Sequence, residues 1–408
     1  MKLLHTSDWH FGMAAGVRSL AEDQRYFLEQ LYEIIEKEQV DAVLLAGDVY
    51  DSSVANAEAI SMYNDATTKI CGEMKLPFII IAGNHDGAAR LASCRELLKG
   101  AGLFVTGRLT REIAPVLLRK QEGAKEGVKE PGAEESCRRE ECEETEIAVY
   151  PIPFFNRDEV IALFPERKEE IISQEMAYKV VCDHIRETMD PGRINIVMAH
   201  AMIVNAELSE SDRTARVGQA LAVSKEVFEG FDYVALGHIH KPQKITERIR
   251  YSGSPLKYSF GKEEEQQKCV LILDTDTMEV REIPLVMRHD RKTVTGTYEE
   301  LIKREELAGD CLRLYVTDRY AGLELLGELR EHFPYLLELY GKSLEETDKF
   351  TSLSISELES LDEVDIMMKF CGENFVDADT ERGYVPGAEQ IALFREVLEW
   401  SEKEAEMS

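Results

Sequence analysis

The sequence lacks the features that mark membrane-spanning, secreted and disulfide-bonded proteins. Its 408 residues include only eight cysteines and two tryptophans. No stretch approaches the ~20 consecutive apolar residues of a transmembrane helix. The N-terminus has neither the basic start nor the apolar core of a signal peptide. Eight scattered cysteines in a chain of this size favour a reducing compartment. We therefore expect a cytoplasmic protein that does not enter a membrane.

Basic residues are also scarce. The chain has 48 Lys and Arg residues against 78 Asp and Glu residues, which gives a formal net charge of −30. Such a charge excludes a protein whose whole surface attracts nucleic acid. It still permits a local nucleic-acid site where bound cations or a partner protein offset the charge. An apolar content of 44% indicates a globular chain, and its length allows two or three domains.

Short apolar runs that end in polar residues recur over the first 240 residues. These runs are Lys2–His5, Ala42–Ala46, Phe78–Ala82, Ile194–Ala199 and Tyr233–Leu236. They are rich in Val, Ile and Leu and show little alternation, which is typical of strands buried on both faces. Between the first two runs, one helical stripe carries Tyr26, Phe27, Leu31, Ile34 and Ile35. The pattern predicts an α/β fold.

Residue types that bind metals stand at the end of each of these runs. In chain order they are Asp8 and His10, Asp48 and Asp51, Asn84 with His85 and Asp86, His200, and His238 with His240. Taken singly, each motif is also explained by turn chemistry. However, the carboxyl ends of strands in an open α/β sheet form binding sites, and six of the nine histidines lie at or beside these positions. The set therefore predicts a metal site with oxygen and nitrogen ligands.

Charge and glycine dominate the segment from 119 to 147. We interpret it as an exposed and largely disordered insertion. Its two cysteines, Cys137 and Cys142, could bind a metal, but two thiols in a solvated loop more often have no role.

The character of the chain changes again near residue 290. Alternating helix and strand patterns over 291–342 predict a small α+β domain. An acidic linker opens the region 343–408, which then carries two amphipathic segments, Ser356–Phe370 and Gly387–Glu404.

The strand-end motifs resemble those of the calcineurin-like metallophosphoesterases. The resembling motifs are D-x-H, G-D-x-x-D, G-N-H-D, a lone His and G-H-x-H, from Asp8 to His240. The runs "LLHTSDWHFG", "LAGDVYDSS", "VALGHIHKPQ" and "YSGSPLKYSFGK" are similar, more narrowly, to the SbcD family of bacterial nuclease subunits. The resemblance implies an α/β sandwich of two central β-sheets flanked by helices at 1–290. It also implies a small DNA-contacting capping domain at 291–342 and a helical, partner-binding C-terminal region at 343–408.

The resemblance further implies two metal ions, with a preference for Mn²⁺ over the chemically plausible Zn²⁺ and Fe²⁺. One ion would be held by Asp8, His10 and His240, and the other by Asn84, His200 and His238. Asp48 would bridge both. His85 resembles the catalytic histidine of the family, with a supporting role for a ligand as the alternative. Asp51 stands where some archaeal relatives have a second histidine, and we expect it to orient a metal-bound histidine or His85 itself.

The function implied is a DNA nuclease with double-stranded 3′-5′ exonuclease and single-strand or hairpin endonuclease activity, in DNA repair, recombination and replication. The implied partners are DNA and an SbcC-type coiled-coil ATPase. Two copies of this chain would form a homodimer, which binds two ATPase chains to make a heterotetramer. Two alternatives stay open: a phosphoesterase for small phosphodiesters or phosphoproteins, and an inactive scaffold on the same fold. Arg90, Arg213 and Ser254 are candidates for substrate contact, although a helix surface or a solvated turn also explains the two arginines.

Overall fold

The computed structural model describes residues 1–16, 18–119, 146–212, 221–342, 351–354, 387 and 390–391. It divides into two compact units, one of Met1–Ala14 with Ser19–Arg291 and one of Ala15–Arg18 with Lys292–Ser408. Most of the predicted insertion, Arg213, and nearly all of the two amphipathic C-terminal segments lie outside the described residues. Among the helices that are described, none has both the length and the apolar character needed to cross a membrane.

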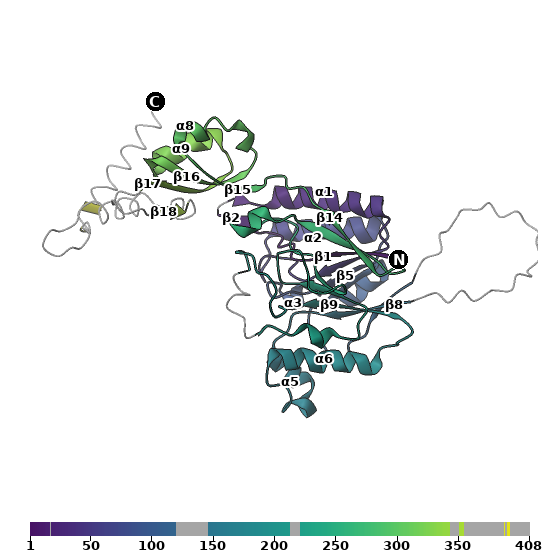
Figure 1. The fold of residues 1–408 in the computed structure, drawn as a ribbon. Coiled ribbons are helices and arrows are strands. Elements are labelled where there is room, and N and C mark those ends of the chain that lie inside the picture. The colour runs from purple at the N-terminus through teal and green to yellow at the C-terminus, as the bar shows by residue number, and fades with distance from the viewer. Residues whose placement is uncertain are drawn as a thin grey trace, which may run out of the picture. The chain divides into compact units, whose positions relative to one another are not determined.

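Two six-stranded sheets form the centre of the first unit (Figure 1). The first has the order β14-β13-β1-β4-β5-β6 and the second β11-β12-β10-β9-β8-β7. The first sheet consists of β1 (Lys2–Thr6), β4 (Ala42–Ala46), β5 (Phe78–Ile81), β6 (Leu103–Thr106), β13 (Cys269–Asp274) and β14 (Glu279–Pro284). The second consists of β7 (Val116–Leu118), β8 (Ile147–Ile152), β9 (Ile194–His200), β10 (Tyr233–Gly237), β11 (Gln243–Lys244) and β12 (Ile249–Tyr251). All five predicted strands are present, within one residue of their expected ends.

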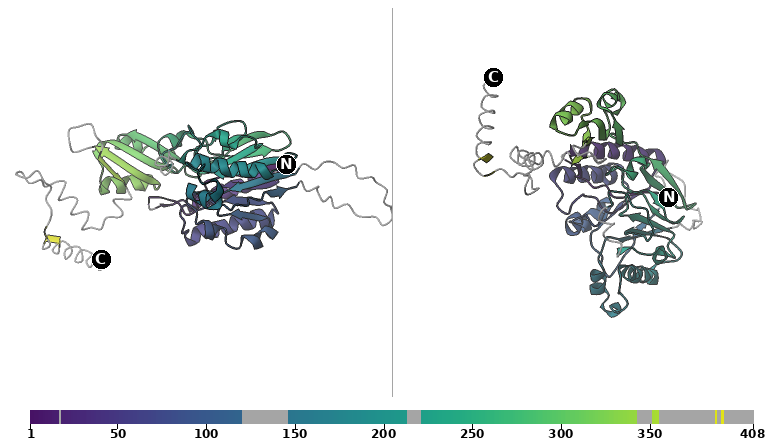
Figure 2. Two further views of the ribbon diagram at one scale, coloured as in Figure 1. Left: turned by 90° about the horizontal axis from the view of Figure 1, so that it is seen from below. Right: turned by 60° about the vertical axis from the view of Figure 1, so that its left-hand side comes forward.

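Helices cover the outer faces of both sheets. Helices α1 (Ala21–Glu38) and α2 (Ala57–Thr67) lie on one side, and α5 (Arg157–Leu163) and α6 (Gln174–Thr188) on the other (Figure 1). In the right-hand view of Figure 2, the purple helix α1 and the teal helices again lie on opposite sides of the strands. Two short helices, α3 (Ala88–Leu91) and α4 (Arg95–Leu98), follow β5.

Only part of the predicted stripe of α1 is buried in the core. Phe27, Leu31 and Ile35 are buried, whereas Tyr26 and Ile34 are half-buried and Leu28 is buried instead. The ring of Phe27 packs edge-on against Trp9 at 5.6 Å, which fixes the helix to the chain that leaves β1.

Apolar side chains from both sheets fill the space between them. This inner core includes Leu3, Leu44, Ile79 and Ile81 from the first sheet and Val149, Ile196, Met198 and Tyr233 from the second. Burial of both faces explains why these strands read as continuous apolar runs. The four layers, helix, sheet, sheet and helix, confirm the predicted α/β sandwich.

The strand directions bring the predicted site together. Strands β1, β4 and β5 run parallel in the first sheet, and β9 and β10 run parallel in the second. Their carboxyl ends therefore share one edge of each sheet. At another edge, β7 and β8 pair antiparallel, and Arg119 and Glu146 form an ion pair of 2.6 Å where the chain leaves and re-enters the described structure.

The second unit is a small α+β fold. Its sheet has the order β15 (Arg291–Gly296), β16 (Cys311–Tyr320), β17 (Leu336–Lys342) and β18 (Thr351–Ser354). Alternate residues of β16, Leu312, Leu314 and Val316, join a core with α9 (Leu323–His332). The run "YEELIKREEL" at 298–307 forms the short helix α8 (Tyr298–Leu301) and a 3₁₀ turn at Glu305–Leu307. The two-residue strands β2 (Ala14–Ala15) and β3 (Arg18–Ser19) are the other described strands.

Candidate metal centre

Backbone hydrogen bonds join the loop after β1 to the loop after β4. The N–H of Asp8 donates to the carbonyl of Gly47, and the N–H of His10 donates to the carbonyl of Asp48, both at 3.0 Å. His200 of the second sheet leaves no room for a side chain at Gly47. A Cβ on Gly47, which has φ +93°, would lie 2.2 Å from Nδ1 of His200. Glycine is therefore required where the G-D motif meets the second sheet.

The carboxylate of Asp86 fastens the loop after β5 to the loop after β4. It accepts hydrogen bonds from three backbone N–H groups, those of Val49, Tyr50 and Gly83, at 2.9–3.1 Å. A Cβ on Gly83 would come within 2.1 Å of Oδ1 of Asp48. Asp86, the last residue of the G-N-H-D motif, therefore has a structural role. It fixes Asn84 and His85 relative to Asp48.

Asp8, His10 and His240 form one cluster. One potential ligand atom from each lies within 4.8 Å of the other two, and all three residues are buried. The Nε2 atoms of His10 and His240 are 3.2 Å apart. Nδ1 of His10 is buried, makes no hydrogen bond of normal geometry and faces Oδ1 of Asp51 at 3.5 Å. The carboxylate of Asp8 accepts the backbone N–H of His238 at 3.1 Å, which ties the first strand end to the fifth.

Asn84, His200 and His238 form a second cluster. Oδ1 of Asn84 lies 3.0 Å from Nε2 of His200 and 2.9 Å from Nδ1 of His238. Nδ1 of His200 lies 2.9 Å from the carbonyl oxygen of Ala46 and must donate its hydrogen there. A hydrogen bond from Nε2 to the oxygen of Asn84 or Asp48 then requires the imidazolium form of His200.

Asp48 lies between the two clusters. Its Oδ2 is 3.3 Å from Nε2 of His200 in the second cluster and 3.7 Å from Nε2 of His10 in the first. It is almost fully buried. The seven residues expected to hold metals thus converge from five strand ends, with one carboxylate in the middle.

The pKa shifts describe a buried and negatively charged site. Burial alone would lower the pKa of His200, but the Asp48 carboxylate raises it to about 9. The pKa of Asp48 is held well below its usual range, since the neighbouring His200 outweighs the effect of burial. Burial lowers the pKa of His238 to about 3 and that of His240 well below its usual value. The last two imidazoles are therefore neutral and retain lone pairs.

These donors fit divalent cations. The carboxylates of Asp8 and Asp48, the amide oxygen of Asn84 and the imidazole of His200 converge on one buried site. Such a set is unfavourable when buried alone, and a cation relieves it. Mixed carboxylate, amide and imidazole ligands suit Mn²⁺, Fe²⁺ or Zn²⁺.

His85 lies beside the ligands and is held by the backbone. Its Nδ1 lies 2.8 Å from the carbonyl oxygen of Asp51, to which it donates. Its ring contacts the ring of His10 edge-on at 4.8 Å. The carboxylate of Asp51 points elsewhere, with Oδ1 3.5 Å from Nδ1 of His10. Asp51 therefore contacts both histidines, His85 through its main chain and His10 through its side chain.

The candidate substrate contacts lie in different surroundings. Arg90 is exposed and donates a 2.5 Å hydrogen bond to the carbonyl of Ser53, in the loop after β4. Ser254 is fully buried, and its hydroxyl contacts the carbonyl of Leu256 and Nζ of Lys268. A buried and engaged hydroxyl cannot meet a substrate, so we now interpret Ser254 as structural.

Several residues that support the site were missed by the sequence reasoning. Tyr258 donates to the carbonyl of Trp9 at 2.8 Å and packs edge-on against the rings of His10 and His240. Ser211, Asp212, Glu263 and Lys268 surround His240. Tyr258 stands in the "YSGSPLKYSFGK" run and Glu263 follows it directly, but nothing in the residue types indicated their burial.

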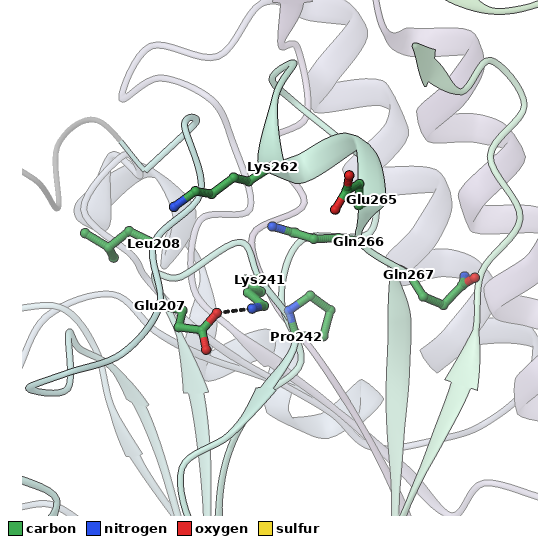
Figure 3. Close-up of a pocket in the computed structure, with 8 residues that line it drawn as sticks. All are labelled: Glu207, Leu208, Lys241, Pro242, Lys262, Glu265, Gln266 and Gln267. Carbon is green, nitrogen blue, oxygen red and sulfur yellow. Dashed lines mark hydrogen bonds and ion pairs between the residues drawn. The ribbon is translucent and has the colours of Figure 1, made fainter. Parts of the chain in front are cut away.

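A polar pocket of about 780 Å³ lies next to the residues that surround His240. It is lined by Glu207, Leu208, Lys241, Pro242, Lys262, Glu265, Gln266 and Gln267 (Figure 3). Lys241, the residue after His240, pairs with Glu207 across it. Gln266 accepts from Lys268 and donates to Ser209, so the wall of the pocket contacts the buried support of His240.

The family model for calcineurin-like phosphoesterases matches residues 1–242. The chain belongs to the calcineurin-like phosphoesterase family. The resemblance predicted from the strand-end motifs is confirmed, and so is the class of metal-dependent phosphoester hydrolase.

Two curated relatives of this phosphoesterase are both named as the SbcD subunit of the nuclease SbcCD. The protein from Staphylococcus epidermidis is 28% identical over 362 residues, which cover 87% of this chain and 89% of that one. The protein from Staphylococcus saprophyticus is 27% identical over 381 residues, which cover 91% and 92%. A crystal structure of the calcineurin-like phosphoesterase YfkN from Bacillus subtilis covers 70% of this chain and 88% of that chain, at 13% identity and a TM-score of 0.32.

Proposed function

We propose that this phosphoesterase is the nuclease subunit of an SbcCD-type complex and hydrolyses phosphodiester bonds of DNA with two bound Mn²⁺ ions. One observation carries the proposal: seven oxygen and nitrogen donors surround one site, with Asp48 between two clusters and His85 beside them. The names of the two staphylococcal relatives, which align along about nine-tenths of the chain, support the nuclease over the small-substrate phosphoesterase and the scaffold.

The ligand sets would be those expected from the motifs. Asp8, His10 and His240 would hold one ion, Asn84, His200 and His238 the other, and Asp48 both. When bound, such a pair supplies an activated water and neutralises phosphate charge during in-line displacement. The protein itself excludes bulk water around the buried ligands and fixes their positions through the Asp86 hydrogen bonds.

His85 is suited to handle a proton. Its Nδ1–H is committed to the carbonyl of Asp51, so Nε2 is the nitrogen that can face a substrate. Its ring is half-buried, so part of it is accessible to solvent. In the imidazolium form, Nε2–H donates to the leaving oxygen of the scissile phosphate, which is general acid catalysis.

The finer activities and partners are part of the same proposal. We expect 3′-5′ exonuclease activity on duplex DNA and endonuclease activity on single strands and hairpins. We also expect a homodimer that assembles with two copies of a coiled-coil ATPase, since the relatives are named as subunits of a complex. The exposed Arg90 beside the loop after β4 remains our candidate for a phosphate contact.

The decisive experiment uses the purified full chain, Mn²⁺ and linear duplex DNA carrying a label at either the 3′ or the 5′ end. We expect early release of the 3′ label and complete arrest by a chelator. The His85→Gln protein is the control for a contaminating nuclease. Intact DNA together with hydrolysis of a small phosphodiester such as bis-p-nitrophenyl phosphate would favour the small-substrate enzyme, and no hydrolysis of either would favour the scaffold.

A further inference from the structure

A fully buried ion pair lies directly behind His240. Nζ of Lys268 is 2.7 Å from Oε1 of Glu263, and both side chains have no exposed area. Lys268 also donates to the carbonyl of His240 at 2.8 Å. Burying two charges is unfavourable unless their remaining hydrogen-bonding groups are satisfied. The other oxygen of Glu263 therefore has to find donors.

Those donors are two serine hydroxyls and one backbone N–H. Oε2 of Glu263 accepts from Oγ of Ser211 at 2.8 Å, from Oγ of Ser259 at 2.6 Å and from the N–H of Ser259 at 2.9 Å. The Lys268 ammonium outweighs burial and lowers the pKa of Glu263 to about 2, so the carboxylate is ionised and can only accept.

Ser211 connects this carboxylate to His240. Its Oγ lies 2.8 Å from Nδ1 of His240. A hydroxyl has one hydrogen, and Ser211 gives that hydrogen to Glu263, so its oxygen must accept from His240. Nδ1 of His240 consequently carries a proton. Oδ1 of Asp212, which accepts the backbone N–H of His240 at 3.0 Å, lies 3.5 Å from the same Nδ1 and favours the same arrangement.

The opposite ring nitrogen is then free of a proton. Nε2 of His240 faces Nε2 of His10 at 3.2 Å, inside the first ligand cluster. In the metal-free protein it accepts the hydrogen of His10, whose own Nδ1 faces Oδ1 of Asp51 at 3.5 Å. When a cation is bound, the same lone pair is available to it.

We propose that Glu263, acting through Ser211, fixes His240 in the Nδ1–H tautomer, and that Lys268 keeps Glu263 ionised for this task. These are positioning residues, since they act on Nδ1 of His240 and not on Nε2, which faces the ligand cluster. The tautomer assignment concerns the metal-free chain, whereas its consequence for metal affinity rests on the proposed function. Second-layer hydrogen bonds of this kind are worth about 10–100-fold in metal affinity.

The chain offers a matched pair of variants. Ser211→Ala and Ser259→Ala each remove one hydroxyl that donates to Oε2 of Glu263, but only Ser211 contacts His240. We expect ¹⁵N-histidine NMR of the metal-free full chain to show His240 protonated at Nδ1 in the parent and in Ser259→Ala. The signal is assigned by its loss in His240→Gln. In Ser211→Ala the two ring nitrogens should shift towards a mixture of tautomers.

Mn²⁺ titration provides the second measurement. One of two binding steps should weaken by about 10-fold or more in Ser211→Ala and by less than about 2-fold in Ser259→Ala. Equal tautomer populations in the two variants, or an Nε2–H tautomer in the parent, would overturn the proposal. A parent chain that binds no Mn²⁺ but shows the expected tautomers would instead refute the proposed metal-dependent function and leave the positioning role standing.

Discussion

The backbone N–H of His85 donates a 2.8 Å hydrogen bond to Oδ1 of Asp48. The other oxygen of this carboxylate faces the ring nitrogens of both ligand clusters. One side chain therefore holds the G-N-H-D loop in place and completes both proposed metal sites, so its loss and the loss of a ligand from one cluster should have different consequences.

We expect Asp48→Ala to lose both metals and Asn84→Ala to lose only one. The reason is that Asp48 lies between the clusters, whereas Asn84 contacts only His200 and His238. Elemental analysis of the purified proteins after Mn²⁺ loading and desalting measures the metal content per chain. Two metals per chain in Asp48→Ala would refute the bridging assignment.

His85→Gln should retain both metals and DNA binding but cleave about 10²–10⁴-fold more slowly, because a general acid is removed and the ligands remain. Asp51→Asn is the matched control, since the carbonyl that accepts from His85 stays in place. We expect its cleavage to fall far less, and its Mn²⁺ affinity to change through the carboxylate beside His10. Single-turnover cleavage at saturating Mn²⁺ compares the two. Parental cleavage by His85→Gln would exclude the catalytic role.

Stability should depend on pH through His5. This buried side chain bonds to the hydroxyl of Tyr233 at 3.0 Å and the carbonyl of Leu236 at 3.1 Å, so it joins β1 to β10. Burial lowers its pKa to about 3, against 6.5 in the unfolded chain. Below pH 6.5 the unfolded state binds a proton that the folded state does not. The stabilisation is therefore complete above pH 6.5 and is lost progressively as the pH falls towards 3.

At pH 5 the free energy of unfolding is lower by about 2 kcal/mol because of His5, at 1.36 kcal/mol per pH unit. We expect His5→Gln to be less stable than the parent at pH 7 but to lose correspondingly less stability between pH 7 and pH 5. Urea unfolding of the metal-free proteins at both pH values measures this difference. An identical pH dependence in parent and variant would show that His5 does not titrate across the unfolding transition.

Partner binding by the C-terminal region is best tested by truncation after Ser354. Strand β18 (Thr351–Ser354) pairs with β17, so cutting earlier would remove an edge strand of the second unit. The truncated chain should keep its metal content and its cleavage of DNA. It should no longer co-purify with the coiled-coil ATPase subunit when the two are expressed together. Formation of the full complex by the truncated chain would place the docking surface elsewhere.

The strand ends and the gathering of Asp, His and Asn side chains behind them were predictable because both signals are local. An apolar run followed within a few residues by Asp, His or Asn can be read without knowledge of distant contacts. The parallel arrangement of the strands then brings these residues together. Asp8 and His238 are 230 residues apart, yet each was found from its own motif.

The support of His240 was not predictable for the opposite reason. Glu263 and Lys268 stand in the run "KEEEQQK", which has the composition of a solvated surface. They are buried because their segment packs against His240. His240 precedes Lys268 by 28 residues in the chain. Ser254 illustrates the same limit, because a serine in a Gly- and Pro-containing run gives no sign of whether it faces a substrate or the core.

Four of the ligand residues adopt backbone conformations that side chains usually avoid. Asp8, His10, Asp48 and His238 have φ values of 53°, 45°, 49° and 98°. Each costs about 1–3 kcal/mol in local strain. Replacing any of them with glycine would relieve that strain but remove a side chain that contacts the site. If these residues persist under laboratory evolution, their persistence indicates selection for activity. If they mutate to glycine, selection for activity has been lost.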